Sequence, residues 1–239
     1  MDDLISEKER IEQIRNWWSE YGYYVIGGII VGAGLLYGVN QYQANKLQAQ
    51  LDASTAYETL VEYVVGGELE NAEKTASEIE TKYSDTTYVG QAGLAMARLY
   101  MDQNRDQDAA DALLAVVNGK SGEELKHVAR LRLARVYLYQ DKAEEVVALL
   151  ADIDRGAFAA AYGEVLGDAY AALGRIAEAQ DEYQKVLMDP LSRGVVDPQL
   201  VQWKSLDLPE VEAEAPAEPA EPDAALPVES SDTDTGESE

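Results

Sequence analysis

A run of 25 residues without a charged side chain, from Tyr21 to Asn45, constrains the fold of this chain more than any other feature. Its apolar centre, Tyr23–Val39, would extend roughly 25 Å as an α-helix, and the whole run would exceed the ~30 Å hydrocarbon core of a bilayer. Aromatic residues crowd both ends, as is typical where rings lie among lipid headgroups: Trp17, Trp18, Tyr21, Tyr23 and Tyr24 on one side, Tyr37 and Tyr42 on the other. A buried core helix is the alternative, but the two aromatic belts favour a transmembrane helix over 21–45.

Basic residues in the short flanks predict the orientation of this helix, because cytoplasmic flanks carry the excess of Lys and Arg. Lys8, Arg10 and Arg15 precede the run, whereas Lys46 is the only basic residue that follows it before Lys74. The tail 1–20 is therefore expected in the cytoplasm and the bulk of the chain outside. A cleaved signal peptide is the alternative, but the long charged region before the run and the lack of a clear cleavage site after it favour an uncleaved signal anchor.

The N-terminal tail has a helical pattern of its own. Ile11, Ile14 and Trp18 recur on one helix face. They predict either a short amphipathic helix lying on the inner leaflet or one continuous helix that runs into the span.

Glycines within the span are spaced for helix packing. Pairs of glycines four residues apart leave notches where another helix backbone can approach closely. The expected contacts with a membrane helix are Gly28, Gly32, Gly34 and Gly38. Incidental glycine is the alternative, since glycine is common in membrane helices.

The segment 46–208 has the pattern of a helical repeat. Within Tyr162–Pro190, a small residue lies three positions before a Tyr, a Gly marks a turn, and Ala, Tyr and Pro follow, which is the tetratricopeptide spacing. Weaker copies give marker tyrosines at 63, 100, 137 and 170, with periods of 37, 37 and 33 residues. We therefore expect an all-α fold in which about four helix pairs stack over Ala53–Pro190. An irregular helical bundle is the alternative, and Leu200 and Trp203 mark a candidate capping segment.

Stacked helix pairs form a concave groove that the first helix of each pair lines. Counting from each marker Tyr, as in the repeat family, gives the groove candidates Tyr57, Val61, Val64, Leu94, Arg98, Met101, Leu131, Arg135, Leu138, Glu164 and Asp168. An apolar floor with two arginines suits a peptide or an unfolded chain, although several of these side chains are expected to pack between repeats instead. Tetratricopeptide domains that hold a C-terminal carboxylate use Lys and Asn where this chain has Tyr57 and Val61, so that subclass is not expected.

The net negative charge of the chain argues against binding to nucleic acid. The chain has 19 Lys and Arg against 45 Asp and Glu, a net charge of −26 that repels phosphates. From Asp207 to Glu239 there are twelve acids and no Lys or Arg, together with five of the seven prolines. We expect 209–239 to be a disordered acidic tail, which either aids solubility or docks on a partner.

The sequence carries no recognisable motif for catalysis. Without Cys, and with His127 as the only His, thiolate sites and paired-His metal sites are excluded. No P-loop, dinucleotide fingerprint, nucleophile elbow or zinc-protease motif is present. We expect His127 at the surface and no catalytic residue, metal or cofactor.

The run from Ile11 to Lys46, together with ASTAYETL at 53–60, resembles the YfgM-like family of Gram-negative bacteria. The resemblance covers roughly residues 5–205, and the acidic tail departs from the family's short-tailed pattern. It implies an ancillary subunit of the SecYEG translocon, anchored in the inner membrane with its domain 46–208 in the periplasm. It also implies association with a membrane-anchored periplasmic chaperone of the parvulin-like type, and help for exported unfolded proteins. An organiser of envelope assembly or division is the alternative, and an enzyme on a helical scaffold is a third.

Overall fold

Helices make up most of residues 2–209, the residues that the computed structural model describes, with side chains from Glu9 onward. The elements in chain order are α1 (Asp2–Gly66), α2 (Leu69–Lys82), α3 (Tyr88–Asp102), α4 (Asp106–Asn118), α5 (Glu123–Tyr139), α6 (Ala143–Leu150), η1 (Gly156–Phe158), α7 (Ala159–Ala172), α8 (Ile176–Met188), η2 (Ser192–Gly194) and α9 (Pro198–Leu206). Residues 2–209 contain no strand, so the predicted all-α class is confirmed. The acidic tail expected over 209–239 lies outside the described residues except for Pro209.

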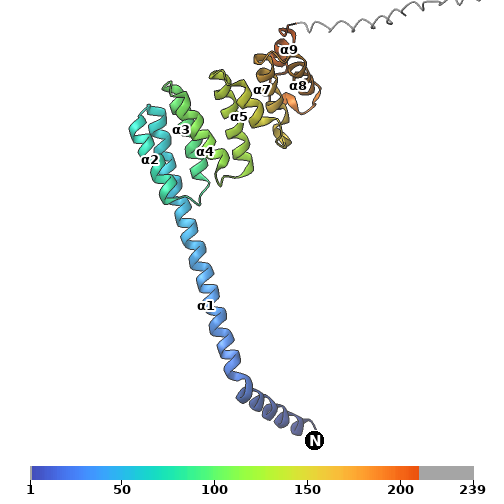
Figure 1. Cartoon of the computed structure of the whole chain (residues 1–239). Coiled ribbons are helices and arrows are strands. Elements are labelled where there is room, and N and C mark those ends of the chain that lie inside the picture. Colours follow the sequence, from blue (N-terminus) through green and yellow to red (C-terminus); the bar gives the residue numbers. More distant parts are fainter. Residues whose placement is uncertain (1, 210–239) are drawn as a thin grey trace, which may run out of the picture.

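The first helix, α1, is 65 residues long and joins three predicted segments without a break. It includes the N-terminal tail, the uncharged run and the first helix of the repeat domain. Of the two predicted alternatives for the tail, the structure has the continuous helix that runs into the span. Its first turns bend away from the rest (Figure 1). Among the described residues, α1 is the one helix that is long and apolar enough to cross a membrane, judged by length and composition.

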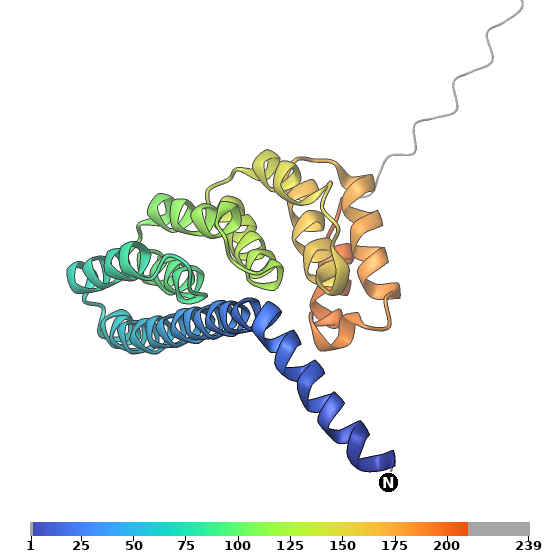
Figure 2. The same ribbon diagram turned by 90° about the horizontal axis from the view of Figure 1, so that it is seen from below.

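Four helix pairs follow one another along an arc (Figure 2). The C-terminal part of α1 pairs with α2, and α3–α4, α5–α6 and α7–α8 form the other pairs. The predicted solenoid of about four helix pairs is thereby confirmed. Each interface between neighbouring pairs has a buried apolar cluster, and a fourth cluster joins α7, α8 and α9. The larger members of the four clusters include Leu60, Ile79, Leu99, Leu113, Leu133, Leu150, Leu166, Tyr183 and Val201.

The marker tyrosines owe their periodicity to a turn that recurs in every pair. The carbonyl of each marker Tyr accepts the N–H five residues later at 2.8–2.9 Å, a Schellman-type helix ending. The residue before that N–H has a positive φ in each copy: Gly67, Asn104, Asp141 and Gly174. Three copies also hold a cation over the tyrosine ring: Arg105 over Tyr100, Lys142 over Tyr137 and Arg175 over Tyr170. The spacing therefore reflects how each first helix ends and turns into its partner.

Small residues on the first helices allow the two helices of a pair to touch. A methyl group on Gly167 of α7 would overlap the ring of Tyr183 on α8. A methyl group on Gly93 of α3 would lie 2.5 Å from a methyl carbon of Val116 on α4. These positions require glycine because the partner side chain occupies the space.

Candidate functional site

The concave side of the arc is formed by the first helices of the pairs. Successive first helices contact one another, α1 with α3, α3 with α5, and α5 with α7. Because like helices meet on the inner side of a curved stack, the first-helix surface is where the sequence predicts a groove.

Most predicted groove residues are half-buried. The ring of Tyr57 lies 5.7 Å from the ring of Tyr88, centroid to centroid, so part of its surface is used between α1 and α3. Met101 packs against the core beneath α3, and Leu131 and Leu138 pack against the core between α5 and α7. Val61 and Val64 are also half-buried. These side chains therefore pack between repeats with part of their surface and leave the rest exposed on the first helices.

Leu94 does not fit a ligand-binding role. Its side chain is only 8% exposed and belongs to the core cluster with Leu113 and Leu133. The position count placed it on the groove, but α3 turns it into the interface with α4 and α5. A partner in the groove would reach little of it.

The two predicted arginines are exposed and lightly engaged. Arg98 lies 3.8 Å from Asp102 on its own helix, and Arg135 lies 4.0 Å from Glu164 on α7. Exposed pairs of this length contribute little stability. Both guanidinium groups can therefore donate hydrogen bonds to carbonyls or carboxylates of a partner.

The acids at the last pair are already occupied within the chain. Lys204 of α9 lies 2.8 Å from Glu164 and 2.7 Å from Asp168, and the Tyr183 hydroxyl donates to Asp168 at 2.7 Å. Burial, followed by the Asp168 carboxylate, raises the pKa of Tyr183 well above its ordinary value. The structure thus brings Glu164 and Asp168 together, but Lys204 of α9 covers them, a contact that no pattern in the sequence predicts.

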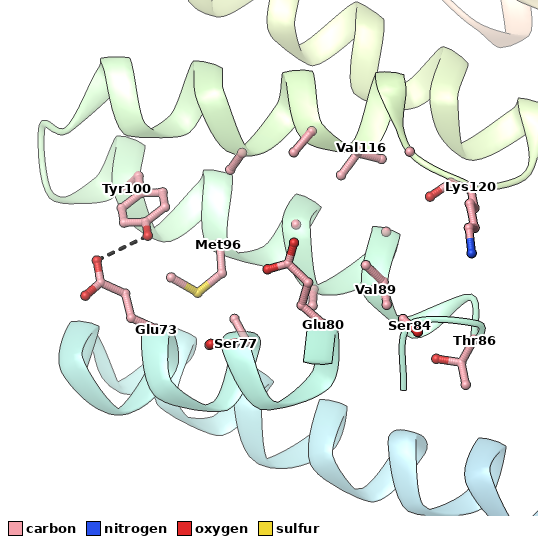
Figure 3. Close-up of a pocket in the computed structure, with 18 residues that line it drawn as sticks. Glu73, Ser77, Glu80, Ser84, Thr86, Val89, Met96, Tyr100, Val116 and Lys120 are labelled. Carbon is pink, nitrogen blue, oxygen red and sulfur yellow. Dashed lines mark hydrogen bonds between the residues drawn. The ribbon is translucent and has the colours of Figure 1, made fainter. Parts of the chain in front are cut away.

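A hollow of about 550 Å³ lies on the other side of the array, between α2 and α4 with α3 as its floor. None of the predicted groove residues lines it. Figure 3 shows Met96 between the carboxylates of Glu73 and Glu80, with Lys120 at the far end. Glu73 accepts the Tyr100 hydroxyl at 3.1 Å (Figure 3). Burial and the Glu73 charge together raise the pKa of Tyr100.

The residues that line this hollow explain why it is open and which ligand groups it could accept. Small residues leave the space open where larger side chains would fill it: Ala76, Gly90, Ala92, Gly93, Ala112 and Ala115. An aliphatic side chain with a neighbouring cation would match its apolar floor and its two carboxylates. Clustered Gly and Ala on α3 were the available signal in the sequence.

His127 lies between two helices rather than at the surface, so that expectation was wrong. Its ring stacks on Phe158 with centroids 4.9 Å apart, and its Nδ1 lies 2.7 Å from the hydroxyl of the fully buried Tyr162. The contact joins α5 to the start of α7. The single imidazole therefore has a structural role at a repeat interface.

The glycines of the span have free space around them. A methyl group on Gly28, Gly32, Gly34 or Gly38 would meet no atom within 4 Å, leaving out the backbone of the helix itself. The packing of the described chain therefore does not require glycine at these positions. A packing role for them would involve a helix from another molecule.

The stacked pairs and their recurring turns define a tetratricopeptide-like solenoid, and comparisons with known proteins agree. A family model described as "Tetratricopeptide repeat-like domain" matches residues 15–210. The "Ancillary SecYEG translocon subunit" of Escherichia coli K12 is 30% identical over 177 residues, which cover 73% of this chain and 84% of that protein.

Two further relatives carry the same name. The protein of Haemophilus influenzae is 26% identical over 182 residues, covering 76% of this chain and 88% of the relative. The protein of Neisseria gonorrhoeae is 25% identical over 203 residues, covering 84% of this chain and 96% of the relative. The chain belongs to the YfgM-like family, as its N-terminal segment indicated. No solved structure matches it with significance.

Proposed function

We propose that this chain is an ancillary subunit of the Sec translocon, anchored in the inner membrane by 21–45 with its N-terminus in the cytoplasm and its repeat domain in the periplasm. The name shared by its relatives supports the association with SecYEG. The bias of basic residues toward the N-terminal flank supports the orientation. The repeat fold and the relatives' names also support a non-enzymatic role.

The observation that carries the proposal is the continuity of α1. The uncharged run and the first helix of the solenoid belong to one helix of 65 residues. A span that continues into its domain as one helix fixes the orientation of the domain relative to the bilayer. That property suits a scaffold that arranges proteins around a membrane channel.

The groove is proposed to receive one segment of a membrane-anchored periplasmic chaperone of the parvulin-like type. Its half-buried apolar floor and its lightly engaged arginines, Arg98 and Arg135, suit a short peptide segment. Four helix pairs offer little length for holding varied unfolded chains, and α9 covers the last pair. Exported unfolded proteins are therefore the second candidate for this groove.

Topology is tested with reporter fusions after Leu208. A reporter that is active only in the periplasm should be active there, because Lys8, Arg10 and Arg15 hold the N-terminus inside. Activity of only a cytoplasmic reporter at the same position would overturn the orientation and the export function with it.

Association is tested by affinity isolation from membranes in mild detergent, followed by mass spectrometry. SecYEG subunits should be recovered, and Gly28→Leu combined with Gly32→Leu should reduce their recovery without preventing insertion. The matched control is Ile29→Leu with Ala33→Leu, which has the same spacing on another face of the helix. Equal recovery with both pairs would show that the glycines are incidental.

The groove is tested with Arg98→Glu combined with Arg135→Glu, since both side chains are exposed and the change should leave the fold intact. Crosslinking from a photoreactive residue at Met101 should give one dominant adduct that this variant loses. A smear of many adducts would instead identify unfolded clients as the occupants.

A further inference from the structure

The C-terminal end of the solenoid carries an apolar surface that the described chain leaves uncovered. Between residues 187 and 206, seven large apolar side chains are exposed: Leu187, Met188, Leu191, Val195, Leu200, Trp203 and Leu206. From residue 46 to residue 186 there are only five: Leu47, Leu51, Val65, Leu114 and Tyr139. The last repeat of a solenoid ordinarily needs a polar outer face for solubility, and this end has the opposite character.

Helix α9 presents part of this surface in a fixed geometry. Leu200, Trp203 and Leu206 recur every three residues and are 41%, 60% and 74% exposed, forming one stripe along the helix, which we call the α9 stripe. The opposite side holds α9 in place, because Val201 is fully buried and Lys204 pairs with Glu164 and Asp168.

The start of α9 is also well formed. The Asp197 carboxylate accepts the Gln199 N–H at 2.9 Å, and Pro198 occupies the first turn. The α9 stripe therefore belongs to an anchored helix, and a partner would bind it without first ordering it.

Charge indicates what covers the stripe. The chain that begins at the end of α9, Asp207–Glu239, carries twelve acids and no Lys or Arg. A second copy of this chain would bring two such segments together, and their repulsion would oppose pairing. A bilayer is equally unsuitable, because α1 leaves the array at the end opposite to α9 (Figure 1). Charge complementarity therefore favours a partner that is itself basic.

We infer that the α9 stripe docks a basic amphipathic helix of another protein, whose apolar side chains lie on the stripe and whose Lys and Arg complement the net negative charge of this chain. The stripe would give the complex its specificity, and the acidic segment would speed the encounter. The inference rests on exposure and charge at this end of the array, and it is independent of the proposed occupant of the groove.

The first test uses a defined probe, a labelled helical peptide with Leu on one face and Lys on the other. The peptide is titrated with the full-length protein in phosphatidylcholine nanodiscs, with empty nanodiscs as the blank. Trp203→Ser should weaken binding about 30-fold, as loss of a central aromatic anchor does, and Leu206→Ser should also weaken it. Ser205→Ala, on the same helix but on the side away from the stripe, is the matched control and should bind as the unchanged protein does.

Charge is tested in the same titration. Replacing every Lys of the peptide by Glu should abolish binding, and deleting 210–239 should lower the affinity and its dependence on salt. Binding that is unchanged in both the Trp203→Ser and the Leu206→Ser variants would overturn the inference, as would equal binding of the Glu peptide.

The natural occupant is identified in living cells by a photoreactive residue at Trp203, with the same residue at Gln107 on α4 as the control. An adduct whose crosslinked peptide is a Lys- and Arg-rich amphipathic helix, absent from the control, supports the inference. An adduct with a second copy, with lipid or with this chain's own acidic segment overturns it, and so does the lack of any adduct.

Discussion

Replacing Lys204 with Met would remove the charge that holds α9 on α7 while keeping most of the apolar stem. The Lys204 side chain is 26% exposed and that of Glu164 only 12%, so the pair lies between the surface and the interior. Breaking a buried pair costs about 3–5 kcal/mol, and an exposed pair contributes about 0–1 kcal/mol. Glu164 would keep only Arg135 at 4.0 Å, whereas Asp168 would keep the Tyr183 hydroxyl.

We therefore expect a loss of about 2 kcal/mol, concentrated in α9, which corresponds to about a 30-fold increase in local opening. Hydrogen exchange of the full-length protein in detergent, read by mass spectrometry over 198–206, measures this opening directly. Glu164→Gln added to Lys204→Met should restore part of the protection, because the stranded charge is gone. Unchanged exchange in the Lys204→Met variant would show that Val201 alone holds α9 and that the ion cluster contributes nothing.

Three further predictions concern packing, the turns and pH. Gly167→Ala should lower the free energy of unfolding by about 1–3 kcal/mol because the methyl group overlaps the Tyr183 ring, whereas Gly194→Ala, with open space around it, should have little effect in thermal melting. Asp141→Gly should raise the free energy of unfolding slightly, by up to about 0.5 kcal/mol, since Asp141 has a φ of 58°; a lower melting temperature would contradict this. Burial lowers the pKa of Lys204, but its bonds to Asp168 and Glu164 outweigh burial and raise it, so exchange protection of α9 should persist up to about pH 10 and fall above it.

The fold was predictable because its signals are local and periodic. A marker tyrosine lies in the last turn of each first helix, and the residue four positions later adopts positive φ in all four copies. Gly67 and Gly174 predict this turn from the sequence, whereas Asn104 and Asp141 are less specific signals for it. The continuity of the N-terminal tail with the span was left open because the sequence from Ile11 to Tyr21 contains neither Pro nor Gly to end a helix, yet nothing that requires one to continue.

The site was only partly predictable because position along a helix does not determine how neighbouring helices cover it. Leu94 and Arg98 are one turn apart on α3, yet the first is buried and the second exposed. Glu164 and Asp168 have groove positions, but their partner Lys204 lies about 40 residues further along the chain. Contacts of this range depend on the curvature of the whole stack, which spacing within one repeat does not encode.

The continuity of α1 also limits which partners can reach the groove. With 21–45 in the bilayer, Tyr57 lies 12 residues beyond the span on the same helix, or about 18 Å from its end. With the proposed span and the proposed groove, the groove begins close to the membrane surface, and α1 cannot swing it away without breaking hydrogen bonds within the helix. A soluble client would have to approach the lipid to enter this end, whereas a segment just outside the span of a membrane-anchored protein already lies at that height. Geometry thus favours a membrane-anchored occupant for the groove, while the α9 stripe, at the far end of the array, is placed for a partner that extends further from the membrane.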